Sequence, residues 1–215
     1  MNKTLAFVTT LALSLNLMMT SAQASDDSTL LSLQTRWAEV NYQLREKQQE
    51  AGFVELEQQA KAWIQVAPES AAAHIWLGII KSTHAGAAGG LSALGLAKEA
   101  RKALETALQL DATALDGSAY ASLGTLYYKV PGWPFGFGDD DKARQLLEKA
   151  LAINPDGIDP NYFYADYWYE QGDYQQAAKY ANKALQAAPR PQRPLADAER
   201  RKEIAALLQK IERKK

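Results

Sequence analysis

The stretch from Tyr120 to Pro189 decides the fold of this chain, and it reads YASLGTLYYKVPGWPFGFGDDDKARQLLEKALAINPDGIDPNYFYADYWYEQGDYQQAAKYANKALQAAP. Small residues and a proline recur in it at one fixed interval. Ala143, Ala150 and Pro155 are followed 34 residues later by Ala177, Ala184 and Pro189. A period of this length is typical of helix–turn–helix units that stack into a solenoid. The sequence therefore predicts an all-α fold.

The residues around this period have a physical reason for their types. Ala177, Ala181 and Ala184 recur at three- and four-residue spacing, so small side chains share one helix face and neighbouring helices can approach closely. Gly172 lies where the chain must turn between two helices, and Pro189 follows the second helix, which it cannot continue.

A second motif lies on the leading helix, where Leu123-Gly124 with Tyr120 and Tyr127 matches the pattern W-x₂-L-G-x₂-Y with Tyr in place of Trp. On these residues the chain resembles the tetratricopeptide repeat (TPR) family. The resemblance implies one TPR-like α-solenoid domain over residues 25–215, made of about four helical hairpins and a C-terminal capping helix. It also implies a function in protein–protein interaction.

The rest of the chain extends the same pattern in both directions. We expect a degenerate first repeat at 30–68, further repeats at 70–112, 116–155 and 159–189, and a cap helix at 195–213. In the first repeat, Gly52 is expected to separate a helix over 30–47 from one over 53–66. In the last helix, Ile204, Leu207, Leu208 and Ile211 form one apolar stripe surrounded by basic residues. We favour a cap over a basic membrane-surface helix because this stripe is narrow.

The first 24 residues have the features of a secretory signal peptide. Lys3 is followed by a mostly apolar run from Leu5 to Met19, and Ala22-Gln23-Ala24 forms a small-x-small cleavage site before Ser25. A membrane anchor is disfavoured because the apolar run is short and interrupted by polar residues. The chain has no cysteine, so neither a lipid-acceptor cysteine nor a disulfide is available. We therefore expect a soluble periplasmic or secreted protein, without a membrane span after cleavage between Ala24 and Ser25.

Composition argues against several classes of function. Lys and Arg number 24 and Asp and Glu 25, and this near-neutral balance gives no support for a nucleic acid or an anionic membrane as partner. The two histidines, His74 and His84, lie ten residues apart, which is no standard metal-ligand spacing. The glycine-rich segment follows no predicted strand, so it is a poor phosphate loop. We expect no enzymatic activity, no metal and no cofactor.

Two insertions lengthen the turns inside the second and third repeats. They are the glycine-rich segment 84–95 and the segment 130–138, which carries Trp133, Phe135 and Phe137. We expect both to be loops on one edge of the solenoid. The three aromatic side chains either form a binding surface or fold back as a small satellite core. The Asp139-Asp140-Asp141 triplet that follows is better explained as a helix N-cap with an acidic first turn than as a calcium site.

A concave groove is the second candidate for a binding site. If the last repeat is standard, Tyr162, Asp166 and Tyr169 face the groove, and Tyr128 is the counterpart of Tyr169 one repeat earlier. The groove would be largely apolar, with tyrosine hydroxyls as polar groups. It lacks the Lys and Asn set by which chaperone-binding TPR domains hold a C-terminal carboxylate.

Two functions remain open from the sequence. One is a periplasmic scaffold or adaptor that binds a protein partner in the groove. The other is binding of a small apolar ligand, because the hairpins and glycine-rich turns are also similar to the T-component proteins of TRAP-type solute transporters. The chain is shorter than those proteins and lacks their lipoprotein cysteine.

Overall fold

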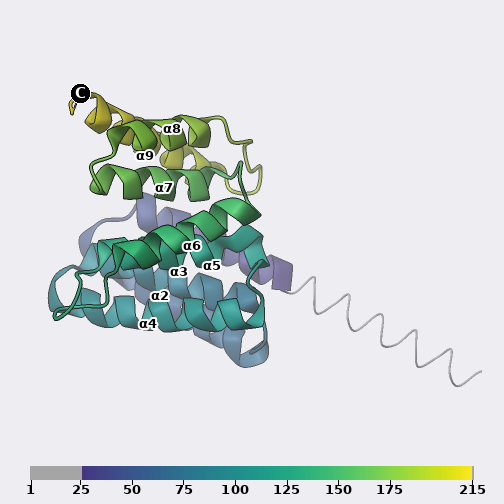
Figure 1. Ribbon diagram of the computed structural model, residues 1–215. Coiled ribbons are helices and arrows are strands. Elements are labelled where there is room, and N and C mark those ends of the chain that lie inside the picture. Colours follow the sequence, from purple (N-terminus) through teal and green to yellow (C-terminus); the bar gives the residue numbers. More distant parts are fainter. Residues whose placement is uncertain (1–25, 215) are drawn as a thin grey trace, which may run out of the picture.

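The computed structural model describes residues 26–214, and this part of the chain folds as a stack of helical hairpins (Figure 1). The expected signal peptide lies outside the described residues. A first helical segment spans 26–42. It is followed by α2 (Glu46–Val66), α3 (Ala71–Ala88), α4 (Gly90–Leu110), α5 (Ala114–Lys129), α6 (Asp140–Ile153), α7 (Ile158–Glu170), α8 (Tyr174–Leu185) and α9 (Pro194–Glu212). The described residues contain no β-strand, and the all-α solenoid predicted from the sequence is confirmed.

Glycine sets the close approach of the two helices within a hairpin. A Cβ on Gly78 of α3 would lie 2.5 Å from Cγ of Leu104, and one on Gly124 of α5 would lie 2.8 Å from Cγ of Leu147. Both leucines are fully buried. The Leu-Gly motif is therefore a packing position, where the missing side chain makes room for a leucine of the following helix.

Helix termini follow the predicted turn chemistry. Asp139 is the N-cap of α6, and its carboxylate accepts a hydrogen bond from the Lys142 amide at 2.9 Å. The acidic triplet is therefore a cap and first turn, as expected. Gly172 adopts a positive φ of 79° in the turn between α7 and α8.

Three expectations about local structure were wrong. Gly52 lies inside α2, where it packs against Val40; the chain instead breaks at residues 43–45. The glycine-rich insertion is not a loop: it lengthens α3 to Ala88 and opens α4 at Gly90, with Gly89 (φ 62°) between them. Alanine, the strongest helix former, outweighs the scattered glycines in this segment. His84, expected in that loop, is consequently a buried residue of α3.

The C-terminal helix α9 performs two packing tasks. Ile204, Leu207 and Ile211, part of the stripe identified in the sequence, are buried in a cluster with the alanines of α8. Arg201 donates hydrogen bonds to the carbonyl oxygens of Leu185 and Ala187, at 2.6 and 2.7 Å, and so satisfies free carbonyls at the end of α8.

The beginning of α9 reaches the opposite end of the array. Ala196 is buried in the same cluster as Leu33, Trp37 and Ala38 of the first helical segment, and Leu195 packs against that cluster. The two ends of the solenoid therefore touch. This contact joins the ends of the array around its inner face, so that the expected groove becomes a deep cavity that is still partly open to solvent.

Candidate binding cavity

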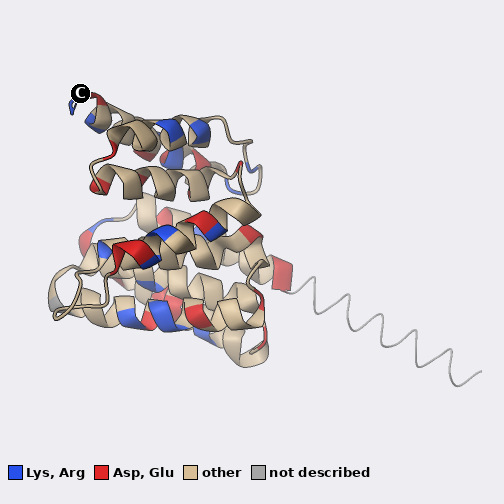
Figure 2. Cartoon of the chain, viewed as in Figure 1, with Lys and Arg blue, Asp and Glu red and all other residues tan. Residues whose placement is uncertain are grey.

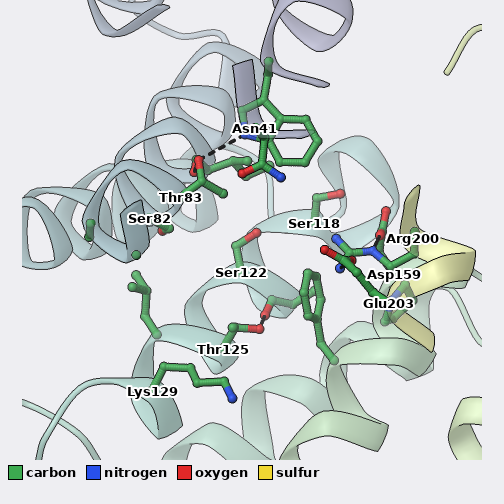
Figure 3. A pocket seen from close by; sticks show the side chains of 18 of the residues that line it. Asn41, Ser82, Thr83, Ser118, Ser122, Thr125, Lys129, Asp159, Arg200 and Glu203 are labelled. Carbon is green, nitrogen blue, oxygen red and sulfur yellow. Dashed lines mark hydrogen bonds and ion pairs between the residues drawn. The ribbon is translucent and has the colours of Figure 1, made fainter. Parts of the chain in front are cut away.

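A cavity of about 1300 Å³ occupies the inner side of the closed array (Figure 3). Its walls come from the first helix of each hairpin, namely the segment 26–42, α3, α5 and α7, and from the extended parts of α3 and α4. The segment after α8 and the first turns of α9 complete the wall where the ends of the array meet. The cavity thus exists because of both the repeat stacking and the end-to-end contact.

One wall displays hydroxyl groups whose hydrogens are already used. Ser82, Thr83, Ser118 and Thr125 each donate to a carbonyl oxygen three or four residues earlier in the chain, at 2.6 to 3.0 Å. Their remaining lone pairs can therefore only accept hydrogen bonds. Thr83 already accepts one, from Nε1 of Trp37 at 3.0 Å. This wall offers acceptors to a ligand that carries N–H or O–H groups.

Where the ends of the array meet, a network of ion pairs fixes the wall. The Asp159 carboxylate accepts from Nε of Arg200 at 2.8 Å and from Nη1 of Arg190 at 2.6 Å. Arg190 also pairs with Asp197, and Arg200 with Glu203. Burial alone would raise the pKa of Asp159, but Arg200 and Arg190 hold it well below its usual range. The network ties α7 to α9 and holds the carboxylate ionised.

Arg193 belongs to the same region and is bonded differently. Its guanidinium makes no hydrogen bond or ion pair with any described residue, and its Nε is buried. The guanidinium carbon lies 5.5 Å from the centroid of the Trp76 ring, an arrangement of the cation–π type. Burial lowers the pKa of Arg193. Both Arg193 and Trp76 line the cavity.

Tyr128 and Asp166, two of the residues predicted for the groove, are brought together. The Tyr128 hydroxyl donates to Asp166 at 2.8 Å, and Lys129 bridges Asp166 and Glu170 at 2.8 Å each. Burial raises the pKa of Tyr128 well above its usual value. Of this group, Lys129 lines the cavity, while Tyr128 and Asp166 lie beside it.

Tyr162 and Tyr169, the other two, pack against the C-terminal cluster instead of lining the cavity. The Tyr162 ring lies under the Arg200 guanidinium at 4.5 Å, and the Tyr169 ring contacts Tyr174 at 5.6 Å. Phe163 and Asp159 of α7 take the lining positions. The face of α7 that points into the cavity is therefore rotated relative to the face predicted from the repeat pattern.

The three aromatic residues of the 130–139 loop are not equivalent. Trp133 is 90% exposed and Phe135 78% exposed, and Phe135 lies at the cavity. Phe137 is partly buried: its ring meets Tyr127 edge-on at 5.5 Å, and the Arg101 guanidinium lies 4.4 Å from its centroid. The loop thus combines one packed anchor with two exposed aromatic side chains.

A charged cluster, buried except for Glu99, was missed in the sequence. Glu57 of α2 accepts from Lys81 at 2.7 Å and bonds His84 at 2.7 Å, and Lys81 also pairs with Glu99 at 2.7 Å. The signal was present, because Lys81 and His84 are three residues apart on one helix face. Burial alone would raise the pKa of Glu57, but Lys81 and His84 lower it. None of these four residues lines the cavity, so the cluster serves to join α2, α3 and α4.

Charge elsewhere on the molecule is dispersed. Basic and acidic residues alternate along the helices seen in Figure 2, and neither sign dominates that view. Within residues 26–214, no group of three His, Asp or Glu side chains is placed to share a metal ion. A search for membrane-spanning helices over the same residues finds none with the required length and apolar character.

Comparisons with known proteins agree with the repeat architecture. A family model described as "Tetratricopeptide repeat" matches residues 135–211. The chain is similar to the crystal structure of a thermophilic TPR protein from Thermus thermophilus, at 18% identity, covering 75% of this chain and 79% of that chain with a TM-score of 0.56. It is more loosely similar to MamA, at 18% identity, covering 78% of this chain and 91% of that chain with a TM-score of 0.46. A search of curated proteins finds no match.

The first of these structural likenesses shows the fold, and the second is too loose to add to it. Proteins built from these repeats are in general non-enzymatic scaffolds for protein–protein interaction. Residues 135–211 therefore match the tetratricopeptide repeat family, and three quarters of the chain share the helical solenoid fold of a protein built from these repeats.

Proposed function

We propose that this protein is a non-enzymatic periplasmic scaffold that binds a segment of a partner protein in its central cavity. The observation that carries the proposal is the combination of size and lining. At about 1300 Å³ the cavity exceeds the roughly 300–1000 Å³ of ordinary small-molecule sites. Its hydroxyl wall presents acceptors, and the amide groups of a peptide backbone are the matching donors.

The residues beside the cavity extend this surface. Tyr128 and Asp166 lie next to Lys129 at its edge, and we place the partner's outer contacts there. Tyr162 and Tyr169 then act by packing α7 in place. Phe135 at the cavity and Trp133 on the same loop supply exposed aromatic area, while Phe137 holds the loop. The periplasmic location rests on the signal-peptide features of the first 24 residues.

A cavity-filling substitution tests the proposal. Ser122 lines the cavity on α5, and Ser122→Trp would occupy space that the partner needs. The matched control is Lys102→Trp, on the exposed face of α4 and outside the lining set. A crosslinking pull-down from periplasm should recover the same partner with wild type and Lys102→Trp, and lose it with Ser122→Trp at unchanged melting temperature. Recovery by all three would contradict binding inside the cavity.

Binding of a small apolar ligand is the second candidate. It is favoured by an apolar part of the cavity wall, formed by Ile79 of α3 with Ala93, Leu94 and Ala97 of α4. The mature protein, purified without detergent, should then retain a small molecule in native mass spectrometry. The same Ser122→Trp substitution should abolish that additional mass.

A further inference from the structure

Two side chains of the cavity wall, Trp76 and Arg193, each carry a buried hydrogen-bond donor without a partner among the described residues. Trp76 is only 2% exposed, yet its Nε1 has no hydrogen-bond partner, and the Arg193 Nε close to it is buried and equally unpaired. Nearly all buried polar groups in native proteins are hydrogen-bonded, so each exception needs an explanation. Here the two exceptions belong to neighbouring side chains that line one cavity.

The acidic groups nearby do not supply the missing partner. Asp159 is bonded to Arg190 and Arg200, Asp197 to Arg190, and Glu203 to Arg200. Arg190 and Arg200 therefore bond these carboxylates, and Arg193 is left without an ion pair of its own. A partly buried guanidinium on an apolar ring binds an anion more strongly than a fully exposed one does.

We infer that the guanidinium of Arg193, seated over the Trp76 ring, forms an anion subsite that recognises a carboxylate of the ligand. The inference rests on the proposed function of the cavity and names the chemistry of what enters it. The apolar wall around Leu94 takes the body of the ligand, so the fitting ligand is an amphipathic anion. A free fatty acid carboxylate and an acidic or C-terminal carboxylate of a peptide share this chemistry.

This subsite arises from the closure of the array rather than from the repeats. Arg193 precedes α9, at the point where the C-terminal segment reaches the first hairpin, while Trp76 belongs to α3. Closing the array brings the two residues together. An open array would leave Trp76 without the cation beside it.

Two fluorescent dyes that differ by one anionic group test the inference. Anilinonaphthalene sulfonate carries a sulfonate on an apolar ring system, and phenylnaphthylamine has the same rings without it. Wild type should bind the sulfonate dye more tightly. Arg193→Gln should reduce this preference by about tenfold, the effect of losing one charge-assisted hydrogen bond, and leave binding of the neutral dye unchanged. Arg144→Gln, which removes a charge outside the cavity, should change neither.

Further variants and competitors complete the test. Arg193→Lys keeps the charge and should restore most of the preference, which protects the test against a folding defect in Arg193→Gln. Displacement of the dye by dodecanoate but not dodecanol would assign the carboxylate to a small molecule. Displacement by a short peptide with a free but not an amidated C-terminus would assign it to a protein segment. Equal binding of both dyes to wild type and Arg193→Gln would overturn the subsite alone, whereas no binding of either dye would overturn the cavity as a site as well.

Discussion

The loop between α5 and α6 allows a sharp separation of stability from binding. Phe137 is the packed member of the loop, and Trp133 and Phe135 are the exposed ones. We therefore predict that Phe137→Ala destabilises the protein, while the double change Trp133→Ala and Phe135→Ala does not. The two changes remove aromatic rings from the same loop, so each serves as the control for the other.

The magnitude follows from the contacts of the Phe137 ring. Partial burial of an aromatic side chain contributes about 1–2 kcal/mol, below the roughly 1.5–3 kcal/mol of full burial. The edge-on contact with Tyr127 and the Arg101 guanidinium each add about 0.5–1 kcal/mol. The free energy of unfolding should therefore fall by about 2–4 kcal/mol. The double variant should stay within about 0.5 kcal/mol of wild type, as is usual for exposed positions.

Thermal and urea unfolding followed by circular dichroism measure both variants. For a chain of this size, 2–4 kcal/mol corresponds to a fall in melting temperature of about 4–16 °C. The double variant should melt with wild type and lose partner capture. A double variant that melts as low as Phe137→Ala would refute the division of the loop, because it would show that Trp133 and Phe135 are packed in solution.

Three further predictions concern the ends of the chain and the ion-pair network. Truncation after Pro189 removes the three buried aliphatic side chains of α9, each of which contributes about 1.5–3 kcal/mol before entropy is counted. The truncated protein should therefore aggregate or lose cooperative unfolding. A melting curve like that of wild type would contradict the capping role. Asp159→Asn should lower the free energy of unfolding by at most about 3–5 kcal/mol near neutral pH, because Arg190 stays paired with Asp197 and Arg200 with Glu203. The pKa of Asp159 in the folded protein lies below its unfolded value of about 3.9, so the ionised carboxylate stabilises the fold above about pH 4 and this stabilisation is lost as the pH falls further. In urea unfolding at a series of pH values, the Asn variant should therefore lose less stability than wild type between about pH 5 and pH 3. N-terminal sequencing of the protein from the periplasmic fraction should begin at Ser25, and an intact N-terminus in the membrane fraction would contradict export.

The repeat architecture could be predicted because its signals are local. Gly78 and Gly124 follow a leucine at the same place in two successive hairpins, and Ala177, Ala181 and Ala184 recur at helical spacing within α8; packing of adjacent helices requires small residues at these positions. Caps such as Asp139 are equally local, since the side chain bonds an amide only three residues away. Features set within one hairpin were therefore accessible from the sequence.

The cavity could not be predicted from the sequence in the same way. It depends on the packing of Ala196 into the cluster that holds Leu33, Trp37 and Ala38, and apolar residues so far apart in the chain have no periodic signature. The lining of α7 also shifted, from Tyr162 to Phe163, because the repeat pattern fixes which residues pack but not how far the helix rotates toward the inside. The segment 84–95 was predicted to be a loop because of its glycines, but the high helix propensity of its alanines makes most of it helical.

The contact between the two ends of the array is the claim on which the cavity and its anion subsite depend. Thr35 and Gln192 are exposed residues that line the same small cleft between the first helical segment and the start of α9. The chain has no cysteine of its own, so Thr35→Cys with Gln192→Cys gives a pair without background. Treatment of the folded protein with a short bismaleimide should produce an intramolecular crosslink between these two positions, identified by mass spectrometry of the digest. Full labelling of both thiols without that crosslink would show that the array is open in solution and would contradict the closed cavity.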